Sequence, residues 1–277
     1  MVLTHSSGSM SGDSIVGLIG HPVSHSIGQI VYNRIFQDLG MDSVYLAMDV
    51  HRDILPLFMI RSGFLRAFNV TIPHKVSVIP FLDSMDPIAT ETHSVNLVVR
   101  IDGAMKGYNT DYFGIEYALK AKGIDVRGKR AVVAGSGGIA RTAIRYLLDH
   151  GAGGIDVLTR DVRRAQENLA FSGINICDHI NSEYDMYINC TPIGTFGEGD
   201  PFSTVRFESD SIGIDLVYNP MRTPFLMRME NAGGKIVSGI DIFIGQGLRT
   251  LELVFGISPE EMFRKYALEA LDEIRKI

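Results

Sequence analysis

The sequence predicts an α/β protein with two domains in series: an N-terminal domain with a mostly parallel sheet, then a domain of the Rossmann type. Short apolar runs alternate with longer stretches of helical periodicity, as in sheets covered by helices. The alternation starts near residue 15 and begins again after a turn-rich segment at 122–129. A glycine-rich turn follows the first strand of the second series. The 277 residues are enough for two such units.

Each predicted element follows from its local pattern. In the first series, the periodicity predicts strands at 15–19, 44–48 and 67–70, and helices at 27–39 and 52–60. In the second, it predicts strands at 131–135, 155–158, 186–189, 213–216 and 235–237, and helices at 139–150 and 163–171. The two series are joined near 109–114.

A helix start signal marks the C-terminal part of the chain. Ser258, Pro259 and Glu261 combine an N-cap, a proline at the first helical position and a capping-box glutamate. The apolar residues that follow fall on one face, which predicts core packing: Met262, Phe263, Tyr266, Ala267, Ala270, Leu271 and Ile274.

These patterns predict domain boundaries. We expect a first domain over 14–110 and a second over 111–242, with a cleft between them. Residues 1–13, rich in serine and glycine, are expected to be a disordered tail.

Composition excludes several classes of function. The net charge of −6 provides no general attraction for nucleic acid or an anionic membrane, and basic residues form no patch interleaved with aromatics. The longest uncharged stretch, 15–33, contains too many polar residues to lie in lipid. Two cysteines are too few for a disulfide scaffold and no metal motif is present, so we expect a cytoplasmic protein. The expected assembly is a monomer or homodimer.

The glycine-rich turn predicts a dinucleotide site. Gly135, Gly137 and Ala140 match G-x-G-x-x-G/A, directly after a strand and at the start of a helix. The glycines allow a tight turn and a close approach of the diphosphate, and the helix N-terminus offers free N–H groups. The segment expected to hold the cofactor runs through Ser136, Gly138 and Ile139 as well. A glycine-rich β-to-α turn that binds no nucleotide is the alternative.

The end of the next strand bears on the choice between NADP and NAD. An acid there binds the ribose of NAD, whereas arginines accommodate the 2′-phosphate of NADP. Thr159, Arg160 and Arg164 favour NADP, while Asp161 leaves NAD open.

In the first unit, polar segments follow the apolar runs at 20–26, 69–75 and 107–111. Ligands of open α/β sheets bind beyond the carboxyl ends of the strands, so these segments predict one pocket. Within it, Lys75 beside Asp111 could hold and transfer a proton, as reduction of a carbonyl by hydride requires. Taken singly, each could instead be an ordinary surface residue.

The motifs together resemble the shikimate dehydrogenase family over nearly the whole chain from Ile15. The similar segments are GHPVSHSIGQ at 20–29, NVTIPHK at 69–75, SVNL at 94–97, NTD at 109–111, GSGGIAR at 135–141, TRD at 159–161, NCTPIG at 189–194, DLVYNPMRTPFL at 215–226 and GIDIFIGQG at 239–247.

The resemblance implies an enzyme that reduces 3-dehydroshikimate to shikimate reversibly with NADP, in aromatic amino acid biosynthesis. By matching position, Lys75 and Asp111 would be the acid/base pair. The residues implied to bind substrate are Ser24, Ser26, Thr71, Asn96, Tyr218 and Gln246. Thr191 and Gly239 would join the cofactor site, with Gly239 beside the nicotinamide. The resemblance also implies that 14–110, completed by C-terminal helices at 243–277, is the substrate-binding and catalytic domain, and that 111–242 is the dinucleotide-binding domain.

The sequence also departs from the family pattern. Gly28 stands where the family has a second serine for the substrate carboxylate, and Gln29 replaces the proline that follows it. Two alternatives therefore stay open: a related dehydrogenase that acts with NAD or NADP on quinate or another hydroxylated cyclic acid, and a nucleotide-binding module without turnover.

Overall fold

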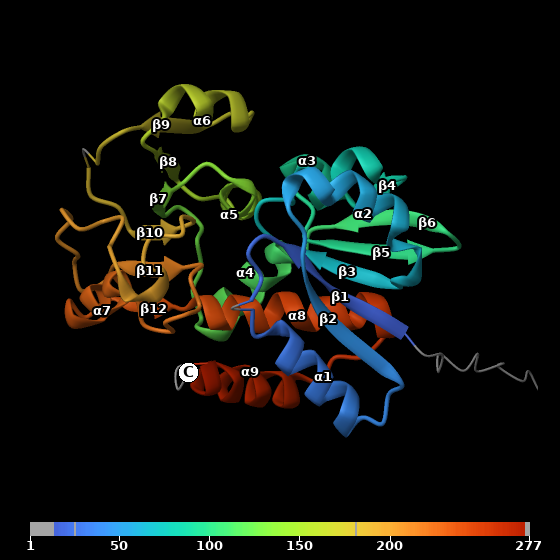
Figure 1. The fold of residues 1–277 in the computed structure, drawn as a ribbon. Helices are drawn as coiled ribbons and strands as arrows, with labels where there is room; N and C mark the ends of the chain where they lie inside the picture. The colour runs from blue at the N-terminus through green and yellow to red at the C-terminus, as the bar shows by residue number, and fades with distance from the viewer. Residues whose placement is uncertain (1–13, 25, 181, 275–277) are drawn as a thin grey trace, which may run out of the picture.

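The computed structural model describes residues 14–24, 26–180 and 182–274, so the tail expected at 1–13 lies outside the described residues. The described chain forms two sheets that stand side by side, with helices around and between them (Figure 1). The predicted α/β fold class is confirmed.

The first sheet has the strand order β2-β1-β3-β5-β6-β4. Its β5 runs antiparallel to both of its neighbours, and the other strand pairs are parallel, which confirms a mostly parallel sheet. The strands are β1 (Ser14–Gly20), β2 (Ser43–Asp49), β3 (Ala67–Val70), β4 (Ser84–Met85), β5 (Leu97–Ile101) and β6 (Ala104–Tyr108).

The second sheet has the order β12-β11-β10-β7-β8-β9, and its neighbouring strands are all parallel. This is the strand order of a Rossmann fold, in which the order reverses between β7 and β10. The strands are β7 (Arg130–Ala134), β8 (Gly154–Leu158), β9 (Ile174–Cys177), β10 (Met186–Asn189), β11 (Ile212–Asp215) and β12 (Lys235–Val237).

Helices cover both sheets. They are α1 (Gly28–Asp38), α2 (Leu55–Arg61), α3 (Pro87–Thr92), α4 (Asp111–Ala121), α5 (Gly138–Asp149), α6 (Val162–Asn168), α7 (Pro224–Asn231), α8 (Gly239–Phe255) and α9 (Glu260–Ile274). Short 3₁₀ turns lie at Arg52–Ile54, Ser62–Phe64, Ile79–Phe81 and Thr195–Gly197. Two predicted helix ends differ by more than one residue: the helix expected over 52–60 begins as a 3₁₀ turn, and the one expected to reach 171 ends at Asn168 because Leu169 leaves helical geometry.

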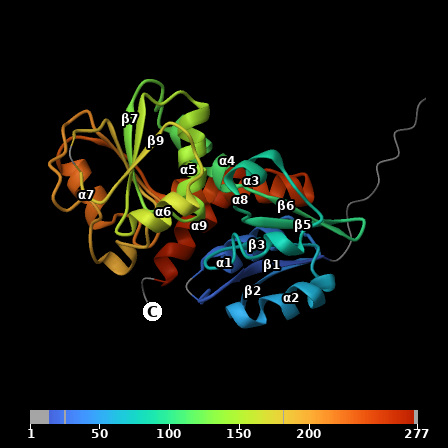
Figure 2. The same cartoon turned by 90° about the horizontal axis from the view of Figure 1, so that it is seen from above.

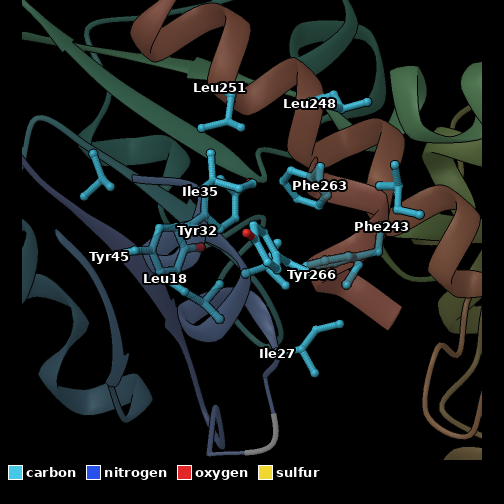
Figure 3. Packing of buried hydrophobic residues seen from close by; sticks show 14 of the residues in the cluster. Leu18, Ile27, Tyr32, Ile35, Tyr45, Phe243, Leu248, Leu251, Phe263 and Tyr266 are labelled. Carbon is cyan, nitrogen blue, oxygen red and sulfur yellow. The ribbon is translucent and has the colours of Figure 1, made fainter. Parts of the chain in front are cut away.

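The C-terminal helices share a hydrophobic core with α1 and the first sheet, although they follow the second sheet in sequence (Figures 1 and 2). Phe263 of α9 meets the ring of Tyr32 of α1 edge-on at 5.4 Å, and Tyr32 stacks on Tyr45 of β2 at 4.3 Å (Figure 3). The predicted apolar face of the last helix packs into this core, which confirms that prediction.

The chain leaves the first sheet through α4 and returns to it through α8, and these two helices cross in backbone contact. A Cβ added to Gly245 of α8 would lie 2.6 Å from Tyr117 Cβ and 3.0 Å from Gly114 Cα, both on α4. A Cβ on Gly114 would lie 2.6 Å from the carbonyl oxygen of Ile242. The crossing therefore requires glycine on both helices.

This contact makes a stability prediction. Gly245→Ala should lower the free energy of unfolding by about 2 kcal/mol, because overpacking a closely packed site outweighs the better helix propensity of alanine. Gly63→Ala is the matched control, since no atom lies within 4 Å of the added Cβ. Urea denaturation of both variants measures the difference, and equal midpoints would contradict a close crossing.

Candidate active site

The structure brings together the two residues predicted to move a proton. Lys75 lies in the turn after β3, and Asp111 is the first residue of α4. Lys75 Nζ donates to Asp111 Oδ2, and the two side chains are only 17% and 9% exposed. A nearly buried lysine and carboxylate that are hydrogen-bonded to each other can serve as a general acid and base.

Amide side chains lie beside this pair. Asn96 Nδ2 donates to Thr110 Oγ1 at 2.9 Å and to Gln246 Oε1 at 3.2 Å, and Asn96 Oδ1 accepts from the N–H of Thr110 at 2.6 Å. Thr110 precedes Asp111, so these bonds connect the predicted residues Asn96 and Gln246 to the start of α4. Thr110 and Asn69 were not among the predicted site residues. Asn69 Nδ2 donates a hydrogen bond to the carbonyl oxygen of Asn96 at 3.3 Å. Thr110 and Asn69 both stand within the polar segments noted in the sequence.

The loop after β1 also contributes to this region. Burial raises the pKa of Tyr218, and a hydrogen bond with the Ser26 hydroxyl opposes that shift. Ser26 Oγ also accepts from the N–H of Gly28 at 3.3 Å, whereas Ser24 is exposed. Tyr218 follows β11, so residues from both units meet here.

The predicted residue Thr71 and the residue Gln29, which departs from the family pattern, both make close contacts in this region. Thr71 packs against the end of β1, where a Cβ on Gly20 would lie 2.4 Å from Thr71 Cγ2. Gln29, in place of the family proline, accepts from the N–H of Ala47 at 2.7 Å and so supports β2. Glutamine at position 29 therefore contributes a hydrogen bond to β2 that a proline could not make.

The glycine turn has the local geometry that the motif predicts. Gly135 adopts a φ of 105°, which favours glycine, and Gly137 is the N-cap of α5, with open space where a side chain would stand. Ala140 is fully buried between helix and sheet. Ser136 and Ile139 are partly exposed along the same turn. The free N–H groups of this helix start and the open space fit a diphosphate.

The first turn of α5 faces the other unit. A Cβ on Gly138 would lie 2.7 Å from Ser94 Oγ and 3.6 Å from Lys75 Cβ. The predicted cofactor turn and the acid/base pair are therefore neighbours. Thr191 packs on the same turn, 3.1 Å from where a Cβ on Gly135 would stand.

At the end of β8, the structure gives Asp161 a definite role. Its carboxylate accepts from the N–H of Arg164 at 3.0 Å and caps α6. Its own N–H donates to Thr159 Oγ1 at 3.3 Å. Arg160 and Arg164 are exposed, and no carboxylate of the described residues pairs with either. These guanidinium groups are available to an anion, while Asp161 is engaged with the helix.

The last predicted residue, Gly239, begins α8 against the backbone of the segment after β11. A Cβ there would lie 2.5 Å from the carbonyl oxygen of Val217 and 2.7 Å from the backbone nitrogen of Tyr218. Any larger residue would push α8 away from Tyr218.

Within 14–24, 26–180 and 182–274, no group of His, Cys, Asp or Glu side chains is arranged to hold a metal ion. Among those same residues, no helix is long and apolar enough to cross a membrane.

Comparisons with known proteins agree with this geometry. Residues 18–98 match the family model described as the shikimate dehydrogenase substrate binding domain. A shikimate dehydrogenase (NADP+) from Thermoplasma acidophilum is 66% identical over 267 residues, which cover 96% of this chain and 100% of that protein. One from Bacillus cereus is 33% identical, covering 93% of this chain and 98% of its own.

Solved structures are similar as well. A crystal structure of a shikimate dehydrogenase with NADP+ has a TM-score of 0.83 at 30% identity, covering 93% of this chain and 96% of its own. The Thermus thermophilus enzyme with NADP(H) and shikimate has a TM-score of 0.82 at 28% identity, covering 93% and 99%. On these matches, the chain belongs to the shikimate dehydrogenase family.

Proposed function

We propose that this protein is an NADP-dependent shikimate dehydrogenase, which reduces 3-dehydroshikimate to shikimate reversibly. The observation that carries the proposal is the Lys75–Asp111 pair, nearly buried and next to the glycine turn of a Rossmann unit. The named relatives support the same substrate and cofactor.

The chemistry divides between cofactor and protein. Bound NADPH supplies the hydride that adds to the carbonyl carbon of the substrate. The carbonyl oxygen gains a proton from the Lys75–Asp111 pair, and the same pair removes that proton in the oxidation direction. Near burial of both side chains keeps water from competing for this proton.

The polar groups around the pair would bind the substrate. Ser26 and Tyr218 would donate to its carboxylate, while Thr71, Asn96 and Gln246 would bond its ring hydroxyls; exposed Ser24 would lie at the rim. A site that hydrogen-bonds each hydroxyl rejects ligands lacking one, because its buried polar groups are then left unpaired.

The cofactor would lie along the Rossmann unit. Its diphosphate would rest on the turn from Gly135 to Ala140, its nicotinamide near Thr191 and Gly239, and its 2′-phosphate near Thr159, Arg160 and Arg164. One oxygen of Asp161 caps α6, which engages this carboxylate with the helix and supports the choice of NADP over NAD.

We also propose the domain assignment, with 14–110 and 243–277 as the substrate and catalytic domain and 111–242 as the cofactor domain. The reaction would take place in the cleft between them. We propose in addition that the protein is a cytoplasmic monomer or homodimer; the Lys75–Asp111 pair and its neighbours lie within one chain.

Gly28 favours a second candidate, a dehydrogenase for quinate or a related cyclic acid. The missing serine hydroxyl removes one donor from the substrate carboxylate site.

An activity matrix tests the proposed function. NADP+ and NAD+ are each offered with shikimate and with quinate, and formation of reduced nicotinamide is followed by absorbance. We expect the highest kcat/KM for NADP+ with shikimate. A higher value with quinate would favour the second candidate, and absence of turnover with all four combinations would contradict the proposed function and also exclude quinate as the substrate.

Lys75→Ala tests the acid/base pair. Loss of a positioned proton donor should lower kcat by about 10³-fold, while the Kd of shikimate changes only a few fold, since the donor acts mainly in the transition state. Exposed Lys122 provides a matched control, and Lys122→Ala should leave both values unchanged. A fall in kcat of less than about tenfold would remove Lys75 from this role.

Asp161→Thr separates capping from ribose binding. Threonine retains the cap, so α6 should stay stable, and removal of a carboxylate near the arginines should tighten NADP+. Asp161→Ala should instead lose about 1 kcal/mol of local helix stability. Titrations of both variants with NADP+ and NAD+ measure the Kd of each cofactor. A loss of NAD+ affinity of about tenfold in Asp161→Thr would show that Asp161 binds ribose.

A further inference from the structure

Arg141 ends the segment GSGGIAR, but the glycine pattern gives it no role. It lies in the first turns of α5, where its N–H donates to the carbonyl oxygen of Gly137 at 3.1 Å. Its guanidinium Nη1 donates to the carbonyl oxygen of His93, just after α3, at 3.0 Å. The side chain therefore reaches from the Rossmann unit to the first unit.

The charge of Arg141 has no counter-charge in the described chain. None of the carboxylates described forms an ion pair with it, and its buried Nε has no hydrogen-bond partner there. Burial lowers the pKa of Arg141, and no acidic neighbour opposes the shift. Arg145, one turn further along, pairs with Asp149 and Glu91. A half-buried, unpaired cation is unfavourable unless an anion joins it.

The position of Arg141 on α5 directs its side chain toward the start of the helix. Helical side chains lean toward the N-terminus, and Arg141 shares a face with Gly138, three residues earlier. Gly138 touches Ser94, the neighbour of the His93 whose carbonyl holds the guanidinium. Ser94 is fully buried, and its hydroxyl, directed at Gly138, has no partner among the described residues. The Ser94 hydroxyl and the Nε of Arg141, neither of which has a hydrogen-bond partner among the described residues, thus belong to side chains near the turn where the helix N–H groups are free.

We propose that Arg141 is a further cofactor-binding residue, whose guanidinium balances the charge of the dinucleotide diphosphate at the start of α5. The inference rests on the proposed function, because it takes a dinucleotide as the ligand. The helix start contributes only a partial positive charge, whereas the diphosphate carries full negative charges. A guanidinium fixed by the His93 carbonyl adds the formal charge that is missing, with donors suited to phosphate oxygens.

The test compares two arginines with NADP+ and NAD+. The diphosphate is common to both cofactors, so Arg141→Gln should raise both Kd values by the same factor, about tenfold for one charge-assisted contact. Arg160→Gln should raise the Kd of NADP+ more than that of NAD+, because only NADP+ has the 2′-phosphate. Arg145→Gln is the matched control and should leave both Kd values unchanged, since Arg145 is already paired.

Two further readouts separate charge from structure. Raising the salt concentration should weaken cofactor binding less in Arg141→Gln than in the unmodified protein, because one screened attraction is gone. The Kd of shikimate should not change. Arg141→Lys, which keeps the charge, should recover part of the cofactor affinity and serves if Arg141→Gln fails to fold.

Unchanged Kd values for both cofactors in Arg141→Gln would overturn this inference alone. Equal losses for cofactor and shikimate would also overturn it, since they would indicate a general structural role. Failure of the unmodified protein to bind either dinucleotide would overturn the proposed function together with the inference.

Discussion

The crossing of α4 and α8 is the contact on which the rest of the structure depends. These helices carry the chain between the two sheets, and Gly114 and Gly245 let their backbones touch. Asp111 begins α4, and Gln246 follows Gly245 on α8, so the crossing sets the distance between a proposed catalytic residue and a proposed substrate ligand. Glycine inside a helix costs about 1 kcal/mol relative to alanine, which here is offset by close packing.

A second contact fixes the cofactor unit against the first. Asn109 donates to Thr92 Oγ1 at 3.0 Å and to Thr142 Oγ1 of α5 at 2.8 Å. Together with the Gly138–Ser94 contact, these bonds set the glycine turn beside Lys75. Hydride transfer needs the two reactants in near contact. The α4–α8 crossing and the contacts around Asn109 join the two units, and so they keep the proposed cofactor site close to the proposed proton donor.

Elements that local sequence patterns specify could be predicted, whereas features that depend on tertiary contacts could not. The glycine turn and the strands of the Rossmann unit follow from period and turn residues, so they were predicted, except for the edge strand β9, which the sequence analysis did not identify. Short β4 and antiparallel β5 depend on pairing with β6 and β3, which no local pattern specifies. The Lys75–Asp111 pair was predictable because both residues lie in polar segments that follow apolar runs. The capping role of Asp161 and the unpaired charge of Arg141 depend on which side chains surround them, which only the folded chain determines.

The central claim is that one site, assembled from both units, holds substrate and cofactor together. A crystal structure of the protein with NADP+ and shikimate tests it most directly. The account predicts that Lys75 Nζ and Asp111 contact the hydroxyl that is oxidised, that Gln246 and Asn96 bond neighbouring hydroxyls, and that the diphosphate lies on the first turn of α5. A ligand bound away from Lys75, or a dinucleotide away from Gly137, would contradict it.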